Sequence, residues 1–256
     1  MAIVKLTIAY DGSSFRGFAR QPRARTVQGL LEEALRTVLG SVPKVSVAGR
    51  TDAGVHAIGQ VVSFEAEVDP ERIQRSINRI LAPEIVVREA RPAPSGFDAR
   101  HSATAREYRY RIRTGPWPDP FSAPFEWHRP GDLRLGAMRR AARLLEGEHD
   151  FASFCRASDT GSTRHLRRLS VSRDGEILQV TAIADAFLHQ MVRSLVGTLV
   201  AVGEGRLDPD DIPGVLEARS RSAAGPVAPP DGLTLVRVRY GPHPRGRGRS
   251  RVSGEA

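Results

Sequence analysis

The first third of the chain alternates between the hydrophobic patterns of strands and helices, and this order restricts the fold more than any other feature. Apolar residues at every second position from Val4 to Tyr10 predict a half-buried strand. Residues 26–40 place apolar side chains three and four apart, between a Thr26 N-cap and a Gly40 stop, as in a core helix. Strands over 45–48, 60–66 and 85–87 and a helix from Asp69-Pro70 to Pro83 complete the series. The order strand, helix, strand, strand, helix, strand predicts a ferredoxin-like unit with both helices on one face of an antiparallel-rich sheet.

A similar alternation returns after the Pro-rich segment at 91–96. The elements predicted there are a strand over 104–113, a helix capped by Asp132, strands over 166–172 and 176–184, a helix over 188–202, a short helix from Asp208 through Leu216, and a strand over 233–240. We therefore expect an α+β fold of two ferredoxin-like halves that form one central, mainly antiparallel sheet with helices packed on one face. The expected domains are 1–100 and 101–242, followed by a disordered tail rich in Arg and Gly over 243–256.

Charge and cysteine content narrow the class of partner and the compartment. The chain has 256 residues and a formal net charge of +9, of which the tail contributes +3. Such an excess favours a polyanionic partner, and nucleic acid is the first candidate. No apolar run approaches the roughly 20 residues that cross a bilayer, and the first residues have no signal-peptide pattern. With Cys155 as the single cysteine, we expect a cytoplasmic protein without membrane spans or disulfides.

The segment Gly49-Arg50-Thr51-Asp52-Ala53-Gly54-Val55-His56 is the main candidate for chemistry. It lies between two β-type apolar runs, which predicts a loop that displays Asp52, its one carboxylate, at a strand end. The small residues after Asp52 leave space for a flat ligand, and glycine adopts backbone angles closed to other residues. From the pattern alone, Asp52 is either a catalytic carboxylate or, as is common in glycine-containing loops, a turn or cap residue.

Arg193 is a second candidate because it lies midway along a helix that is otherwise almost uncharged. It shares a stripe with His189 and Gly197 at four-residue spacing. A buried Arg needs a partner, and pairing with Asp52 would keep that carboxylate ionised, as a nucleophile requires. The alternative is an Arg that extends to solvent at a domain surface.

Two further features stand out, and each has an ordinary structural explanation. Tyr108 shares one face of the predicted 104–113 strand with Tyr110, and a tyrosine there commonly packs in the core. The loop 13–25 interleaves Phe15 and Phe18 with four arginines, a composition typical of RNA-binding loops but equally compatible with an ordinary solvated loop.

Five motifs in order resemble one known family. The segment Ala48 to Ala57 is similar to the active-site signature of the tRNA pseudouridine synthase A family. The other four are Tyr10-Asp11-Gly12-Ser13, Ala103-Thr104-Ala105-Arg106-Glu107-Tyr108-Arg109-Tyr110, Asp150-Phe151-Ala152-Ser153-Phe154 and Phe187-Leu188-His189-Gln190-Met191-Val192-Arg193-Ser194-Leu195-Val196-Gly197. The family usually has Trp-Gln where this chain has Phe18-Ala19.

This resemblance implies a fold, a reaction and partners. The fold would be that of pseudouridine synthases, with an RNA-binding cleft. The reaction would be isomerisation of uridine to pseudouridine at positions 38, 39 and 40 of tRNA, in the anticodon stem-loop. The resemblance further implies tRNA as the substrate, a homodimer, and neither a cofactor nor a metal.

The resemblance also implies the roles of five residues. Asp52 would be the catalytic nucleophile, with Arg193 in a salt bridge to it. Tyr108 would pack against the target base, and Leu233, in Asp231-Gly232-Leu233, would line the same pocket from the opposite side. Arg50 would help to displace the target base, although a structural bond to a neighbouring carboxylate is an equal alternative.

Other classes of site find less support in the sequence. Asp52 and His56 are four residues apart, but no Cys/His cluster supplies further metal ligands. Gly12 to Gly17 has the spacing of a phosphate loop but is followed by Phe18-Ala19, not by Lys-Ser/Thr. Two other functions stay open: a non-catalytic RNA-binding module, and a carboxylate-dependent hydrolase, for which no second catalytic carboxylate is evident.

Overall fold

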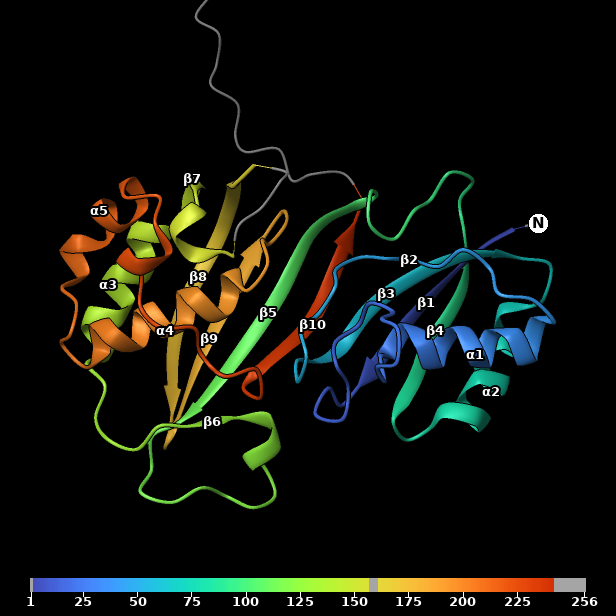
Figure 1. The fold of residues 1–256 in the computed structure, drawn as a ribbon, viewed down its shortest axis with the longest axis horizontal. Helices are drawn as coiled ribbons and strands as arrows, with labels where there is room; N and C mark the ends of the chain where they lie inside the picture. Colours follow the sequence, from blue (N-terminus) through green and yellow to red (C-terminus); the bar gives the residue numbers. More distant parts are fainter. Residues whose placement is uncertain (1, 157–160, 242–256) are drawn as a thin grey trace, which may run out of the picture.

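The computed structural model describes residues 2–156 and 161–241, and these form one large sheet with helices beside it (Figure 1). The strands are β1 (Ala2–Tyr10), β2 (Ser46–Val47), β3 (His56–Ala66), β4 (Ile85–Ala93), β5 (Ala103–Arg113), β6 (Trp127–His128), β7 (Gly147–Asp150), β8 (Thr163–Asp174), β9 (Ile177–Ala184) and β10 (Leu233–Tyr240). The α-helices are α1 (Val27–Leu39), α2 (Pro70–Leu81), α3 (Leu135–Leu145), α4 (Met191–Gly203) and α5 (Ile212–Glu217). Short 3₁₀ helices are η1 (Ala123–Phe125), η2 (Ala152–Phe154), η3 (Pro209–Asp211) and η4 (Arg221–Ala223). The tail predicted at 243–256 lies outside the described residues.

The sheet consists of two halves with the same topology, as predicted. Its strand order is β4-β1-β3-β10-β5-β9-β8-β7, with β2 beside β3 and β6 beside β5. In the first half, β1, α1, β2, β3, α2 and β4 give the spatial order β4-β1-β3-β2. In the second half, β5, α3, β8, β9, α4 and β10 give β10-β5-β9-β8, which is the same order. The predicted α+β class with a mainly antiparallel sheet is therefore confirmed.

The two halves are joined through the last strand. β10 pairs in parallel with the start of β3, where Thr234 lies opposite His56, and antiparallel with β5, where Leu235 lies opposite Tyr108. The backbone of β10 comes so close to Gly59 that a Cβ at that position would overlap Val236 O. Because β10 pairs with a strand of each half, the sheet is continuous across them. The domain boundary near residue 100 stays a prediction.

Helices cover the sheet on the side of the viewer in Figure 1, where α1 lies in front of the first half and α4 in front of the second. α2 packs on β4 and against α1, while α3 packs on β8 and against α4. α1 begins at the predicted cap, since the Thr26 side chain accepts a hydrogen bond from Gly29 N, and it ends at Gly40 in the left-handed conformation. No helix among residues 2–156 and 161–241 is long and apolar enough to cross a membrane.

Several predicted boundaries were wrong, for local reasons. β3 begins at His56, four residues earlier than expected, and β4 continues to Ala93 through part of the predicted Pro-rich crossing. β4 is an edge strand, where proline does not interrupt the ladder. α3 follows Arg134 without a side-chain cap, so Asp132 does not cap it. α4 starts at Met191, which leaves His189 in the preceding turn.

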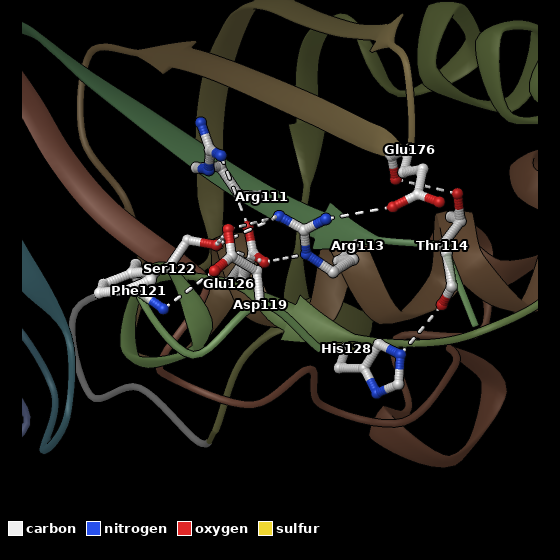
Figure 2. A network of polar contacts seen from close by, with 10 residues as sticks. Arg111, Arg113, Thr114, Asp119, Phe121, Ser122, Glu126, His128 and Glu176 are labelled. Carbon is white, nitrogen blue, oxygen red and sulfur yellow. Dashed lines mark hydrogen bonds and ion pairs between the residues drawn. The ribbon is translucent and has the colours of Figure 1, made fainter. Parts of the chain in front are cut away.

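A polar network fixes the connection between β5 and β6 (Figure 2). Glu126, whose side chain is 1% exposed, accepts hydrogen bonds from Arg113 Nε and, at 2.8 Å, from Ser122 Oγ. Arg113 also reaches Glu176 Oε2 at 3.2 Å and Asp119 Oδ2 at 3.5 Å. Burial alone would raise the pKa of the Glu126 carboxyl, but the hydrogen bonds from Arg113 and Ser122 hold it below its usual value of 4.5.

We expect Glu126→Gln to lower the free energy of unfolding by about 2 kcal/mol at pH 7, because the buried carboxylate that accepts from Arg113 and Ser122 loses its charge. The folded-state pKa of Glu126 is depressed, so its contribution is complete above about pH 4.5 and is lost as the pH falls through the folded value. Urea unfolding at a series of pH values should therefore show the two proteins converging in acid. Glu148→Gln, at an exposed position on β7, is the control that should leave stability unchanged. A constant difference across the whole pH range would contradict this account.

Candidate active site

The loop that carries Asp52, residues 49–55, connects β2 to β3 and is anchored by backbone contacts along its length. Phe18 N donates to Thr51 O at 3.0 Å, Gly54 N donates to Phe15 O at 3.3 Å, and Gln60 Nε2 donates to Gly49 O at 2.6 Å. The loop is therefore fixed by the 13–25 segment on one side and by β3 on the other.

Thr51 and Tyr10 fix the position next to Asp52. Thr51 is 6% exposed, and its hydroxyl lies 2.8 Å from Tyr10 OH, which also accepts from Gln60 Nε2 at 3.4 Å. Burial raises the pKa of Tyr10 to about 12, against the opposing effect of the hydrogen bonds to Thr51 and Gln60, so the phenol stays neutral. The residue that precedes Asp52 is thus locked into the core, while Asp52 itself faces outward with its side chain 23% exposed.

His56 is a structural link between the Asp52 loop and the start of β10. It is 2% exposed, and its Nδ1 accepts from Gly12 N at 3.0 Å. Nδ1 also lies 3.1 Å from Asp11 Oδ1, and Nε2 lies 3.1 Å from Asp231 O. In the same region Gly54 has φ +79°, and a Cβ there would lie 2.8 Å from Pro230 Cγ, so only glycine fits.

Asp52 and Arg193 are brought together from the two halves of the chain. Arg193 Nη1 donates to Asp52 Oδ2 at 3.2 Å, and Arg193 Nε donates to Ala228 O at 2.8 Å. The Arg193 side chain is 14% exposed. The guanidinium is thus fixed at one end by a carbonyl and at the other by the carboxylate, and the two side chains hold each other in place.

Close packing of α4 against the segment before β10 holds Arg193 in its position opposite Asp52. The segment before β10 runs against the helix, with Ala228 N donating to Arg193 O at 3.1 Å and Gly225 N donating to Thr198 Oγ1 at 2.9 Å. Gly197 makes this possible, because a Cβ at that position would overlap Pro226 O. The stripe of Arg193 and Gly197 seen in the sequence therefore marks the face of α4 that meets this segment.

His189 belongs to the site but was not among the predicted site residues. Its Nε2 lies 3.4 Å from Asp52 Oδ1, so each carboxylate oxygen faces one nitrogen-bearing side chain. The four-residue spacing of His189 and Arg193 was the available signal. It was not decisive, because the position of His189 depends on Gln190, which adopts φ +62° just before α4.

Arg106 connects the two sides of the site through backbone carbonyls. Its Nε and Nη2 donate to Ala48 O at 3.1 and 2.7 Å, and its Nη1 donates to Asp185 O at 2.6 Å. Ala48 precedes the Asp52 loop, and Asp185 begins the connection that carries His189. Burial lowers the pKa of Arg106, which is 9% exposed, and its contacts are the carbonyl groups that a buried guanidinium needs.

Tyr108 lies on β5 two residues after Arg106, close enough to Asp52 to be affected by its charge. It is 7% exposed, and the Phe187 ring packs edge-on against it with centroids 5.2 Å apart. Burial raises the pKa of Tyr108, with further contributions from Tyr10 and from the Asp52 carboxylate. The ring is thus a neutral, fixed surface beside the carboxylate.

The other two predicted site residues are Leu233 and Arg50. Leu233, 5% exposed, opens β10 opposite Tyr110. Arg50 is exposed, and its side chain has no hydrogen bond or ion pair within the described residues. The structural bond considered for Arg50 is therefore absent there, and its guanidinium is available to a ligand.

The reading of loop 13–25 as an aromatic RNA-stacking surface was wrong. Phe15 and Phe18 are 3% and 0% exposed, because both rings pack beside Tyr10 under the Asp52 loop. The arginines of the loop remain outside: Arg20 pairs with Glu32, and Arg25 pairs with Glu84 and covers the Phe15 ring. The loop thus offers cations to a ligand but no rings.

The site therefore combines a carboxylate, a guanidinium that fixes it, a neutral aromatic ring and an exposed Arg. These groups suit proton transfer or nucleophilic attack on a flat polar substrate. Among the described residues, no group of three or more His, Cys, Asp or Glu is placed to hold a metal ion.

Comparisons with known proteins agree on one family. The family described as tRNA pseudouridine synthase matches residues 6–102 and 141–241. The chain is 45% identical over 248 residues to the tRNA pseudouridine synthase A of Moorella thermoacetica, covering 94% of this chain and all of that protein. It is 47% identical to that of Frankia casuarinae, over 98% of this chain and 93% of the relative. The protein of the same name from Geobacillus kaustophilus is 44% identical, over 93% and 94%.

Gly197→Ala should lower the free energy of unfolding by about 2 kcal/mol, because its methyl group would force α4 away from Pro226. The control is Gly136→Ala in α3, where a Cβ meets nothing within 4 Å and the better helix propensity of Ala should raise stability slightly. Urea unfolding of both variants measures the difference. Equal stability of Gly197→Ala and the parent would show that the helix does not depend on this close approach.

Proposed function

The chain belongs to the tRNA pseudouridine synthase A family of isomerases acting on tRNA, and from this premise we propose that Asp52 converts uridine to pseudouridine in the anticodon stem-loop. The proposed targets are the uridines at positions 38, 39 and 40. The observation that carries the proposal is the ion pair between Asp52 and Arg193 beside the Tyr108 ring. It supplies a carboxylate, fixed by a guanidinium, next to a ring on which a pyrimidine can stack.

The reaction exchanges one bond of the uracil ring for another. The glycosidic bond between N1 and the ribose breaks, the detached ring rotates, and C5 forms a bond to the same ribose carbon. The proton on C5 is lost and N1 gains one, so the reaction needs no oxidant or reductant. A carboxylate can add to the ring, attack the anomeric carbon or remove a ribose proton, and all three routes begin from ionised Asp52.

The neighbouring residues would hold the base during this exchange. A base within a helix is inaccessible, so the uridine must leave the stack, and Arg50, which is exposed, would take the position it leaves. Tyr108 would pack on the extruded ring, with Leu233 lining the pocket from the other side. Both residues are almost fully buried, which favours the exclusion of water while the uracil is detached.

Replacing Asp52 tests the proposal directly. Asp52→Asn should slow pseudouridine formation on an unmodified tRNA transcript by about 10⁴-fold or more. Its tRNA dissociation constant should stay within about threefold of the parent, because phosphate contacts dominate affinity. The control is Asp69→Asn, since Asn also caps helices and α2 should be preserved.

Four results would contradict different parts of this proposal. No pseudouridine from the parent chain would refute the function. Equal product from Asp52→Asn would refute the catalytic role and favour another residue. Release of free uracil without pseudouridine would indicate a hydrolase, and a biological effect that survives Asp52→Asn would indicate a non-catalytic RNA-binding module.

We further propose that the chain acts as a homodimer in the cytoplasm, where an elongated tRNA can extend over both subunits. Support comes from the loop 115–126, which exposes 79% of Trp117 and 92% of Phe121 on a segment braced by Glu126 and Arg113. Large apolar side chains on a rigid loop are typical of an interface. Sedimentation at micromolar concentration should give twice the mass of one chain, and a monomer would refute the dimer.

A further inference from the structure

The two oxygens of Asp52 have partners of different character. Oδ2 faces Arg193, which is 14% exposed, is held by Ala228 O, and keeps its charge at any working pH. Oδ1 faces His189, whose side chain is 48% exposed. The His189 ring makes no hydrogen bond within the described residues, so its approach to Oδ1 is its one recorded polar contact there. One oxygen is thus fixed, while the other has a partner that is free to move.

The strength of the second contact depends on a proton. Nε2 lies 3.4 Å from Oδ1, which is within ion-pair distance but is not a hydrogen bond in this geometry. A neutral imidazole is held weakly at that distance, whereas an imidazolium is attracted by the full charge of the carboxylate. Histidine is the side chain that changes charge between about pH 5 and 8.

The backbone holds His189 in this place. Gln190 has φ +62° and ψ +7°, a left-handed conformation that non-glycine residues adopt rarely, and it separates His189 from the first turn of α4. His189 O accepts from Arg156 N at 3.2 Å. The backbone at His189 is therefore constrained, and the half-exposed ring is the part that can move.

Within residues 2–156 and 161–241, Asp52 is the one carboxylate within ion-pair distance of the His189 ring. Arg50 lies on the same loop as Asp52, Arg193 lies on α4, and Arg156 follows η2. Asp185, in the same connection as His189, is directed elsewhere, since its Oδ1 accepts from His165 N and Ala186 N. Tyr108 on β5 is held neutral by burial.

We propose that His189 is a proton-dependent latch on Asp52, which occupies Oδ1 when the imidazole is protonated and leaves that oxygen to the substrate when it is neutral. The inference rests on the proposed function and goes beyond it, because it assigns to His189 a positioning role that controls when the carboxylate is available. The latch acts through Asp52 and takes no part in bond making.

The pH profile of a single turnover tests the latch. With saturating enzyme and an unmodified tRNA transcript, the parent rate should fall, by up to about tenfold per pH unit, as the pH is lowered through the range of about pH 5 to 8 in which histidine side chains gain a proton. In His189→Gln and in His189→Phe the rate should change less than about twofold over the same range. At the alkaline end of this range the single-turnover rates of all three proteins should agree within about threefold, because neutral His189 leaves Asp52 Oδ1 to the substrate.

His101→Gln is the matched control, because His101 is exposed on a turn after Asp98 and its variant should keep the acid limb of the parent. Either of two results overturns the proposal: an acid limb that persists in both His189 variants, or a parent rate without such a limb.

A crystal structure of the full chain supplies a readout that does not depend on activity. At about pH 5.5 the free protein should show His189 Nε2 on Asp52 Oδ1, and the contact should be lost in Asp52→Asn. A ring turned away from the carboxylate at that pH would overturn the latch even in an active enzyme. The contact in a protein that makes no pseudouridine would refute the proposed function and leave the latch supported.

Discussion

The ion pair between Asp52 and Arg193 is the interaction on which the site depends. It joins residues 141 positions apart, one from the loop before β3 and one from α4. A carboxylate at a partly buried position is costly unless a cation and hydrogen bonds compensate its charge. Arg193 does so while its own Nε is satisfied by Ala228 O. The paired arrangement of Asp52 and Arg193 therefore exists only when both halves of the chain are folded together.

The scaffold keeps the two partners in register. β10 pairs with both β3 and β5 and so sets the position of one half against the other. Arg106 ties the strand before the Asp52 loop to the connection before α4, and Gly197 lets the segment before β10 lie directly on that helix. These contacts use backbone atoms, which move little. The site is thus fixed by the frame of the sheet and not by long flexible side chains alone.

Much of this arrangement was predictable from local patterns, and the remainder depended on long-range contacts. Alternation and caps predicted most helices and strands, and Arg193 stood out as a charge in an apolar helix. The burial of Phe15 and Phe18 could not be read from composition, because it results from the loop folding back beneath Asp52. The role of His189 was hidden for a similar reason, since it depends on the left-handed turn at Gln190. The insertion of β10 between β3 and β5 is a pairing between distant segments, which periodicity does not encode.

The central claim is that a uridine extruded from tRNA meets Asp52 beneath the Tyr108 ring, in a site assembled from both halves. The most direct measurement is a structure of Asp52→Asn bound to an unmodified tRNA. The account predicts a flipped uridine from the anticodon stem-loop stacked on Tyr108, with its ribose or ring about 3.5 Å from the side chain at position 52. A bound tRNA whose uridines all remain stacked, or whose extruded base lies away from Asp52 and Arg193, would contradict it.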